Sequence, residues 1–234
     1  MSTVRVDTGT ATMISLIGSL ADNKSALGRR YGEWAVSAPT IESAVAAAAM
    51  AQDELGHARS TYPVLDKLGV SRSEEPGLDA GHPMFVISSE LPDWASFIAA
   101  NLVVDGILTT FVATARDSSI EPLAQRARKI LQEEGAHRVH AEAWLKRICR
   151  TGGADADLLR RRIAEFWAQA ARWPGPADDP GYRAAIAESM VSEGPDAVRS
   201  RVREWLNGLL DAEGARVTLD DPDDWSTWDE TRRQ

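Results

Sequence analysis

Residues 52–57 read Gln-Asp-Glu-Leu-Gly-His and residues 132–137 read Gln-Glu-Glu-Gly-Ala-His, so the pattern Gln-acid-Glu-x-x-His occurs twice. The two copies lie 80 residues apart, which indicates an internal duplication of a helical hairpin. Residues i and i+3 of a helix share one face, so the Glu and the His of each copy reach the same point in space. The repeat therefore predicts two helices that each present such a pair, Glu54 with His57 and Glu134 with His137.

Both motifs lie on apolar helix faces that should point into a helical bundle. An unpaired carboxylate buried on such a face costs several kcal/mol, so two facing motifs suggest that a cation holds them together. A buried salt-bridge network is the alternative. The apolar neighbours on the two stripes are Ala47, Met50 and Ala51 around Glu54, and Ala127, Ile130, Ala141 and Trp144 around Glu134.

The segments around the motifs predict four long helices, at residues 12–36, 40–68, 92–116 and 121–150. Pro63 is expected to kink the second helix near its end, and Gly69 to terminate it. Residues 71–90 are rich in glycine and proline and are expected to form a long, non-helical crossover between two hairpins. This pattern predicts an all-α, ferritin-like four-helix bundle with a long crossover.

The C-terminal third predicts two further helices, at residues 157–171 and 181–212. An acidic, tryptophan-containing tail follows from Leu219 onward and is interpreted as a solvated terminus, with docking on the protein body or on a partner as the alternatives. We expect residues 1–234 to form one domain, with a core bundle at about 12–150 and a helical extension at about 155–234.

Composition restricts the partners and the ligand types. A formal net charge of −9 argues against nucleic acid or an anionic membrane as the main partner. No apolar run is expected to reach the roughly 20 residues that span a bilayer, and the N-terminus does not resemble a signal peptide, so a cytoplasmic protein is expected. Cys149 is the only cysteine, so a metal site must use oxygen and imidazole ligands.

The third helix offers one more carboxylate for such a site. Asp105 precedes Glu134 by 29 residues and shares a stripe with Asn101, Leu108 and Val112. Counting about the same distance back from Glu54 leads to Lys24, which shares the inward stripe of the first helix with Leu20, Leu27 and Tyr31. A glutamate is therefore missing where the pattern requires one, and Asp22 or Glu33 would serve only if the helix were irregular.

These motifs resemble those of the catalytic subunit of the multicomponent phenylacetyl-CoA epoxygenases of phenylacetate catabolism, and of the non-catalytic subunit that pairs with it. The segment Leu20-Ala21-Asp22-Asn23 is more similar to the non-catalytic subunit. The other matching elements are Gly32-Glu33-Trp34 with Ala38-Pro39, Gln52 to His57, Leu102-Val103-Val104-Asp105-Gly106, and Glu133-Glu134-Gly135-Ala136-His137.

The resemblance implies that five of the catalytic subunit's six metal ligands are present, and that Lys24 stands in place of the sixth. The non-catalytic subunit does not keep the ligand set, which favours the catalytic type. Three alternatives follow from Lys24. The site could hold two metals with one ligand fewer, or a single metal, or a salt bridge from the lysine to the carboxylates in place of one ion. The five implied ligands are Glu54, His57, Asp105, Glu134 and His137.

The predicted function is that of a non-haem iron monooxygenase that activates dioxygen and oxidises an organic substrate, an aromatic acyl-CoA by resemblance. Iron is the expected metal, with manganese as its substitute, and Glu54 and Glu134 are the expected bridging ligands. Asp53 and Glu133 are expected to accept the free N–H of the histidine in the opposite motif. The alternatives are a non-catalytic scaffold subunit of an oxygenase and an iron-handling or peroxidase protein.

Three further expectations concern single residues and partners. Lys24 and Tyr31 are candidate catalytic residues, although inward aromatic residues such as Tyr31 and Trp144 more often belong to the core. His140 and His82 are expected at the surface. The expected partners are a small-molecule substrate, a reductase and an oxygenase subunit, with the chain in a homo- or hetero-oligomer.

Overall fold

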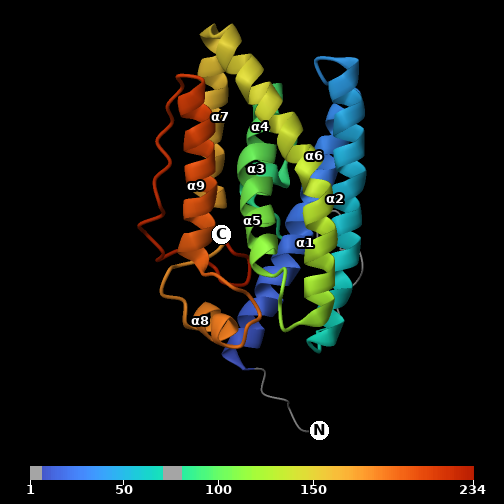
Figure 1. Ribbon diagram of the computed structural model, residues 1–234, viewed down its shortest axis with the longest axis vertical. Coiled ribbons are helices and arrows are strands. Elements are labelled where there is room, and N and C mark those ends of the chain that lie inside the picture. Colours follow the sequence, from blue (N-terminus) through green and yellow to red (C-terminus); the bar gives the residue numbers. More distant parts are fainter. Residues whose placement is uncertain (1–6, 71–80) are drawn as a thin grey trace.

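The computed structural model describes residues 7–70 and 81–234, and within these ranges every regular element is a helix (Figure 1). The all-α prediction is confirmed. The four long predicted helices are α1, α2, the continuous run α4–η1–α5, and α6. Their bounds are α1 Thr8–Trp34, α2 Ile41–Lys67, α4 Trp94–Ala99, η1 Ala100–Asp105, α5 Gly106–Thr114 and α6 Glu121–Thr151.

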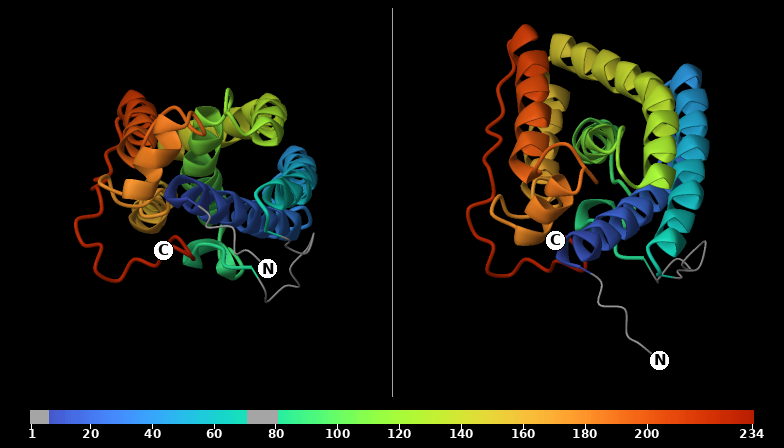
Figure 2. Two further views of the ribbon diagram at one scale, coloured as in Figure 1. Left: turned by 90° about the horizontal axis from the view of Figure 1, so that it is seen from below. Right: turned by 60° about the horizontal axis from the view of Figure 1, so that its bottom comes forward.

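Helices α1 and α2 form a tightly packed hairpin (Figures 1 and 2). The Asp7 carboxylate caps α1 by accepting a hydrogen bond from the Thr10 amide at 2.8 Å, and Thr40 caps α2 in the same way. A Cβ at Gly28 would lie only 2.7 Å from Leu55 Cγ, so the glycine permits the close approach that aligns Lys24 with Glu54. Helix α2 runs through Pro63, and Gly69 follows its end with a φ of +82°.

The third helical run is the most apolar segment of the protein. Residues Trp94–Thr114 reach the length and hydropathy of a membrane span, so the expectation that no run approaches 20 residues was wrong. The segment is mostly buried inside the protein, as the core helix of a bundle is. Its middle turn, η1, is a π-helix that ends at Asp105, and such turns are frequent at functional sites.

The C-terminal third differs from the prediction in its helix count. Helices α7 Gly153–Ala170, α8 Pro180–Ala187 and α9 Pro195–Ala212 pack on the bundle, with α8 against α1 and α9 against α5. The single helix expected at 181–212 is interrupted between Ala187 and Pro195. Helix α8 ends shortly before Ser189, whose φ is +56°, and α9 begins anew at Pro195, which has no N–H to continue a helix, after the extended Gly194. A short helix, α3 Phe85–Ser88, lies in the predicted crossover, of which residues 71–80 lie outside the described residues.

The acidic tail packs on the protein body, so its interpretation as a solvated terminus was wrong. The Arg233 side chain is fully buried and donates hydrogen bonds to the carbonyl oxygens of Trp173 and Pro174. The Trp167 indole N–H donates to the carbonyl of Asp220, and the Ser15 hydroxyl donates to that of Glu230.

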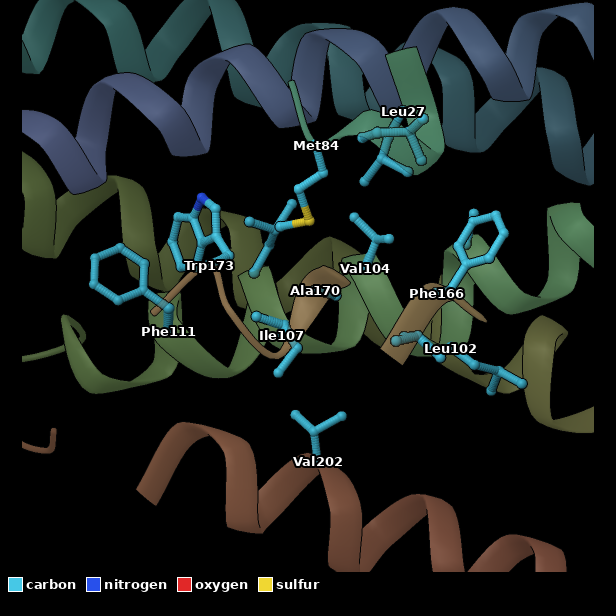
Figure 3. Packing of buried hydrophobic residues seen from close by; sticks show 14 of the residues in the cluster. Leu27, Met84, Leu102, Val104, Ile107, Phe111, Phe166, Ala170, Trp173 and Val202 are labelled. Atoms are coloured by element: carbon cyan, nitrogen blue, oxygen red, sulfur yellow. The ribbon is translucent and has the colours of Figure 1, made fainter. Parts of the chain in front are cut away.

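The apolar core joins the bundle to the C-terminal helices (Figure 3). Leu27 of α1 and Val104 of η1 lie in the same cluster as Trp173, which follows α7, and Val202 of α9. The ring of Trp173 meets that of Phe111 edge to face at 5.2 Å. This packing fixes the third helical run, and with it Asp105, against α1 and α6.

Candidate metal centre

Six ionisable side chains from four helical segments meet inside the bundle, and all of them are at most 4% exposed. One comes from α1, two from α2, one from η1 and two from α6. Their helices bring together every ligand that the sequence predicts. The six residues are Lys24, Glu54, His57, Asp105, Glu134 and His137.

Lys24 lies at the centre of this group. Its Nζ donates hydrogen bonds to Asp105 Oδ1 at 2.6 Å, to Glu134 Oε1 and to Glu54, whose Oε2 lies 3.1 Å away. Burial alone would lower the pKa of Lys24, but the three carboxylates raise it well above its usual value. Lys24 is therefore an ammonium that bridges three helical segments of the bundle.

Asp105 and Glu134 divide their two oxygens between Lys24 and His137, whereas Glu54 contacts Lys24 through both oxygens, Oε1 at 3.2 Å and Oε2 at 3.1 Å. The oxygens that face away from the tightest Lys24 contacts lie near His137 Nδ1, with Glu134 Oε2 at 3.3 Å, Glu54 Oε1 at 3.5 Å and Asp105 Oδ2 at 3.7 Å. His57 Nδ1 lies on the Lys24 side, 3.3 Å from Glu134 Oε1 and 3.7 Å from Glu54 Oε2. The cluster therefore has two halves that share the same carboxylates.

The outer nitrogens of the two imidazoles contact carboxylates of the opposite motif. His57 Nε2 lies 2.9 Å from Glu133 Oε2, and His137 Nε2 lies 3.3 Å from Asp53 Oδ2. These are the crosswise pairs that the sequence suggests. An N–H donated from Nε2 leaves Nδ1 as the free lone pair, so the arrangement turns both Nδ1 atoms toward the cluster.

Neighbouring charges shift the pKa values of the cluster strongly. Burial disfavours both imidazolium ions, but the nearby carboxylates outweigh it and raise the pKa of His57 to about 9 and that of His137 to about 12. Burial and the charge of Glu134 raise the pKa of Asp105 to about 6. Against burial, Lys24 lowers the pKa of Glu54 and holds that of Glu134 well below its usual value. Without a metal, three positive groups balance three carboxylates.

Four of the six residues could together hold a metal ion. Atoms of Glu54, Asp105, Glu134 and His137 all lie within 4.8 Å of one another, and Nδ1 of both His137 and His57 is buried without a hydrogen bond in the described residues. Three carboxylates and one imidazole are a suitable set for iron or manganese. On the His57 side, Lys24 Nζ contacts the shared oxygens that a second ion would need.

The other acids of α1 do not supply the missing ligand. Asp22 accepts hydrogen bonds from the Tyr62 hydroxyl at 2.8 Å and the His82 amide at 3.1 Å. Glu33 is 39% exposed and pairs with Arg30. The departure from a six-ligand set that the sequence indicates therefore persists in the fold.

The remaining aromatic and histidine residues that the sequence analysis considers differ in burial and in contacts. Tyr31 is fully buried, 5.0 Å from the Phe97 ring, and burial together with the three carboxylates raises its pKa well above the usual value. Trp144 donates its indole N–H to Ser43. His140 was expected at the surface, but it is half-buried beside the rings of Trp94 and Phe97. His82 is exposed, as expected.

Sequence reasoning missed one contact of the cluster. The Thr109 hydroxyl donates to Asp105 Oδ1 at 3.3 Å. Its spacing of four residues from Asp105 was the available signal, since residues i and i+4 are helical neighbours.

Comparisons with known proteins agree with the motifs. A model of the family described as phenylacetic acid catabolic protein matches residues 2–234. One component of the 1,2-phenylacetyl-CoA epoxidase of Escherichia coli (strain K12), the one lettered A, is 27% identical over 219 residues, which cover 91% of this chain and 70% of that protein. The family resemblance that the sequence motifs indicate is confirmed.

Proposed function

Because this chain belongs to the phenylacetic acid catabolic protein family, we propose that it is an oxygenase-type oxidoreductase with a single non-haem iron at the shared carboxylates. The observation that carries the proposal is the position of His137 Nδ1, which faces an oxygen of each of Glu54, Asp105 and Glu134. Manganese suits the same donor set.

The proposed site replaces the second metal of a di-iron centre with the ammonium of Lys24. Lys24 contacts one oxygen of Asp105 and one of Glu134 and leaves the other oxygen of each directed toward His137, while it contacts both oxygens of Glu54. Iron held there would supply the electrons that activate dioxygen. Lys24 fixes the three carboxylates in their orientations, and Asp53 holds the His137 ring through its Nε2.

The substrate and partners follow from the family. We propose an aromatic substrate, by analogy with the phenylacetyl-CoA in the name of the relative, and two protein partners, a reductase and an oxygenase subunit. We also propose that the protein is cytoplasmic and that residues 1–234 act as one domain, which the packing of α7 on α4 and of α9 on α5 supports.

A non-catalytic scaffold subunit is the second candidate, and Lys24 is the observation that favours it. An ammonium together with two protonated imidazoles neutralises the three carboxylates without any metal. In that case the cluster would serve stability and assembly alone.

Anaerobic loading with ferrous ion separates these candidates. We expect the wild type to retain about one iron per chain after gel filtration, and the iron to oxidise rapidly on exposure to dioxygen, as followed by electron paramagnetic resonance. His137→Ala should lose this iron, whereas His140→Ala, which removes another imidazole of α6, should keep it. If the wild type retains as little iron as His137→Ala, and His137→Ala is less stable than the wild type, the scaffold function is supported instead.

A further inference from the structure

A chain of aromatic rings leads from the metal centre toward the end of α1. Tyr31 is fully buried and lies seven residues after Lys24, which is about 10 Å along the axis of α1. Its ring centroid is 5.0 Å from that of Phe97, which stacks on Trp94 at 4.3 Å. Trp94 in turn meets Trp34 edge to face at 5.3 Å. Because rings in direct contact exchange single electrons readily, this chain is a possible route for electrons.

The chain also approaches the metal centre from α6. His140 lies one helical turn after His137, which we propose as a metal ligand, so the two are neighbours on α6. The ring centroid of His140 is 6.1 Å from that of Trp94 and 6.2 Å from that of Phe97. Trp94 therefore contacts a side chain next to a proposed ligand.

Most tryptophans of this protein have a positive charge against the ring. Five of the eight have an arginine guanidinium within 6.0 Å of the ring centroid. They are Trp144 with Arg147, Trp173 and Trp228 with Arg233, Trp205 with Arg138, and Trp225 with both Arg172 and Arg199. In the part of the chain that the structure describes, no arginine or lysine lies over the rings of Trp34, Trp94 and Trp167.

This difference in charge decides which rings lose an electron most easily. A cation over an indole is attracted to the electron-rich ring, and such a contact corresponds to roughly a fivefold shift of an equilibrium. Loss of an electron makes the ring positive and turns the attraction into repulsion. Trp34 and Trp94 are therefore easier to oxidise than Trp144, which contacts Trp94 at 5.3 Å but has Arg147 at 4.7 Å.

Tyr31 is a poor place for an oxidising charge to rest. A phenol gives up its proton when it loses an electron, and the buried Tyr31 hydroxyl has no hydrogen-bond partner among the described residues. An indole that has lost an electron can keep its proton. Trp34 is partly buried and lies two residues before Val36, which is 90% exposed. The tryptophan pair thus extends from the interior to the surface.

We propose that Trp94 and Trp34 form a one-electron relay between the metal centre and the surface, which removes oxidising equivalents from the iron when no organic substrate consumes them. Trp94 gives one electron to the oxidised iron, and Trp34 gives one electron to Trp94. A small external reductant such as ascorbate returns one electron to Trp34. In sum, one electron passes from the reductant to the iron, and no proton moves within the chain of rings.

The use of the relay rests on the proposed function, and peroxide treatment of the iron-loaded protein tests it. Ferrous protein prepared without oxygen receives hydrogen peroxide in the absence of organic substrate. Rapid-freeze electron paramagnetic resonance detects a tryptophan radical, and peptide mass spectrometry locates the stable oxidation products. Products at Trp34 and Trp94 should exceed those at Trp225 at least tenfold, because Trp225 is also partly buried but has two guanidinium groups against it. Equal yields at the three residues would overturn the proposal.

Two arginine variants separate the relay from attack by dissolved oxidant. Arg147→Gln removes the cation from Trp144 and should raise oxidation at Trp144 about fivefold. Arg172→Gln is the matched control, because it removes a cation from Trp225, whose described ring contact is with Trp228 and not with the chain. Oxidation at Trp225 should stay low in this variant. An equal rise at Trp144 and Trp225 would mean that dissolved oxidant attacks both, and the relay would be wrong.

Replacing the pair tests protection of the metal centre. Trp34→Phe with Trp94→Phe keeps aromatic rings in both places but removes the indoles that lose an electron easily. The double variant should lose the radical signal and release its iron after fewer additions of peroxide than the wild type, because the oxidising equivalents then attack the ligands. Trp167→Phe is the control outside the chain and should behave like the wild type. The same radical yield and iron retention in the double variant as in the wild type would contradict the relay, and the two single variants serve if the double variant does not fold.

Failure of the relay and failure of the proposed function give different results. If the protein holds iron but oxidation is uniform over its tryptophans, the relay is wrong and the proposed function stands. If the protein holds no iron, the proposed function is wrong, and photo-oxidation of the metal-free protein with ruthenium tris(bipyridine) and persulfate tests the pair. Faster oxidation of Trp34 than of Trp225 then supports the pair as the preferred electron donor, and equal rates overturn it.

Discussion

The decisive perturbation of the metal centre is the replacement of Lys24, whose side chain is fully buried. Lys24→Met removes the ammonium and leaves Glu54, Asp105 and Glu134 without it. Removing one partner of a buried ion pair costs about 3–5 kcal/mol, so we expect the metal-free variant to lose about that much free energy of unfolding. Lys24→Glu adds a carboxylate as well and should destabilise the metal-free protein more.

Metal binding should raise the free energy of unfolding of the wild type and of Lys24→Glu by different amounts. A ligand present at 100 times its dissociation constant stabilises the folded state by about 2.7 kcal/mol for each site. The wild type should therefore gain about 2.7 kcal/mol from Mn²⁺ at that excess, through one ion. Lys24→Glu completes the second half of the site on the His57 side and should gain about twice as much, through two ions.

Urea unfolding followed by circular dichroism, together with metal analysis, measures both quantities. Lys146→Glu is the control, because it makes the same charge change on α6, where Lys146 lies near Glu142 and outside the cluster. It should leave the metal content at one ion per chain. If the wild type binds two Mn²⁺ ions with Lys24 in place, or if Lys24→Glu binds no more than the wild type, Lys24 is not the substitute for a second ion.

Three further predictions concern the histidines and their outer partners. His137→Ala should abolish tight Mn²⁺ binding, whereas His57→Ala should reduce it less, because His57 Nδ1 lies on the Lys24 side; isothermal titration calorimetry compares them. Asp53→Asn should weaken Mn²⁺ binding about 10- to 100-fold in a chelator competition, with Asp66→Asn, at the far end of α2, as the unaffected control. The folded-state pKa of His57, about 9, lies above its unfolded value of about 6.5, so its contribution to stability is complete below pH 6.5 and is lost as the pH rises to 9. Metal-free protein should therefore need less urea to unfold at pH 9 than at pH 6.5. If the urea midpoint changes by the same amount between these pH values in the wild type and in His57→Gln, the assignment to His57 is wrong.

The parts of the fold that the sequence predicts correctly depend on local spacing. The i, i+3 relation within each motif and the count of about 30 residues back from Glu54 were enough to place Lys24 inward among the carboxylates. The prediction of one helix at 181–212 missed the break before α9, although Gly194-Pro195 is a helix-stop signal that is present in the sequence.

The missed features depend on contacts between distant segments. Arg233 binds carbonyl groups 59 and 60 residues earlier in the chain, and nothing in the composition of an acidic tail specifies that contact. The contact of Trp94 of α4 with Trp144 of α6 likewise follows only from the way α4 packs on α6. Helical periodicity gives the inward face of a helix but not the neighbour that covers its outer face.

The charge of the cluster explains why a lysine can occupy the position where the family resemblance implies a glutamate. Replacing a glutamate by a lysine changes the local charge by two positive units, which is the charge of one divalent ion. The three shared carboxylates then face a balanced set of cations before any metal binds, since Lys24 and the two imidazoles are protonated. We therefore expect the bundle to fold without metal, whereas a six-ligand cluster without metal would bury four carboxylates.

This charge balance also makes metal binding depend on pH. When an ion binds at His137, the imidazole must release its proton, because its pKa of about 12 keeps it protonated in the metal-free protein. Release of one proton for each ion bound raises the affinity about tenfold for each pH unit. Chelator competition with Mn²⁺ at pH 7 and at pH 8 measures this slope, and equal affinities at the two pH values would mean that His137 binds the ion without giving up a proton, or does not bind it.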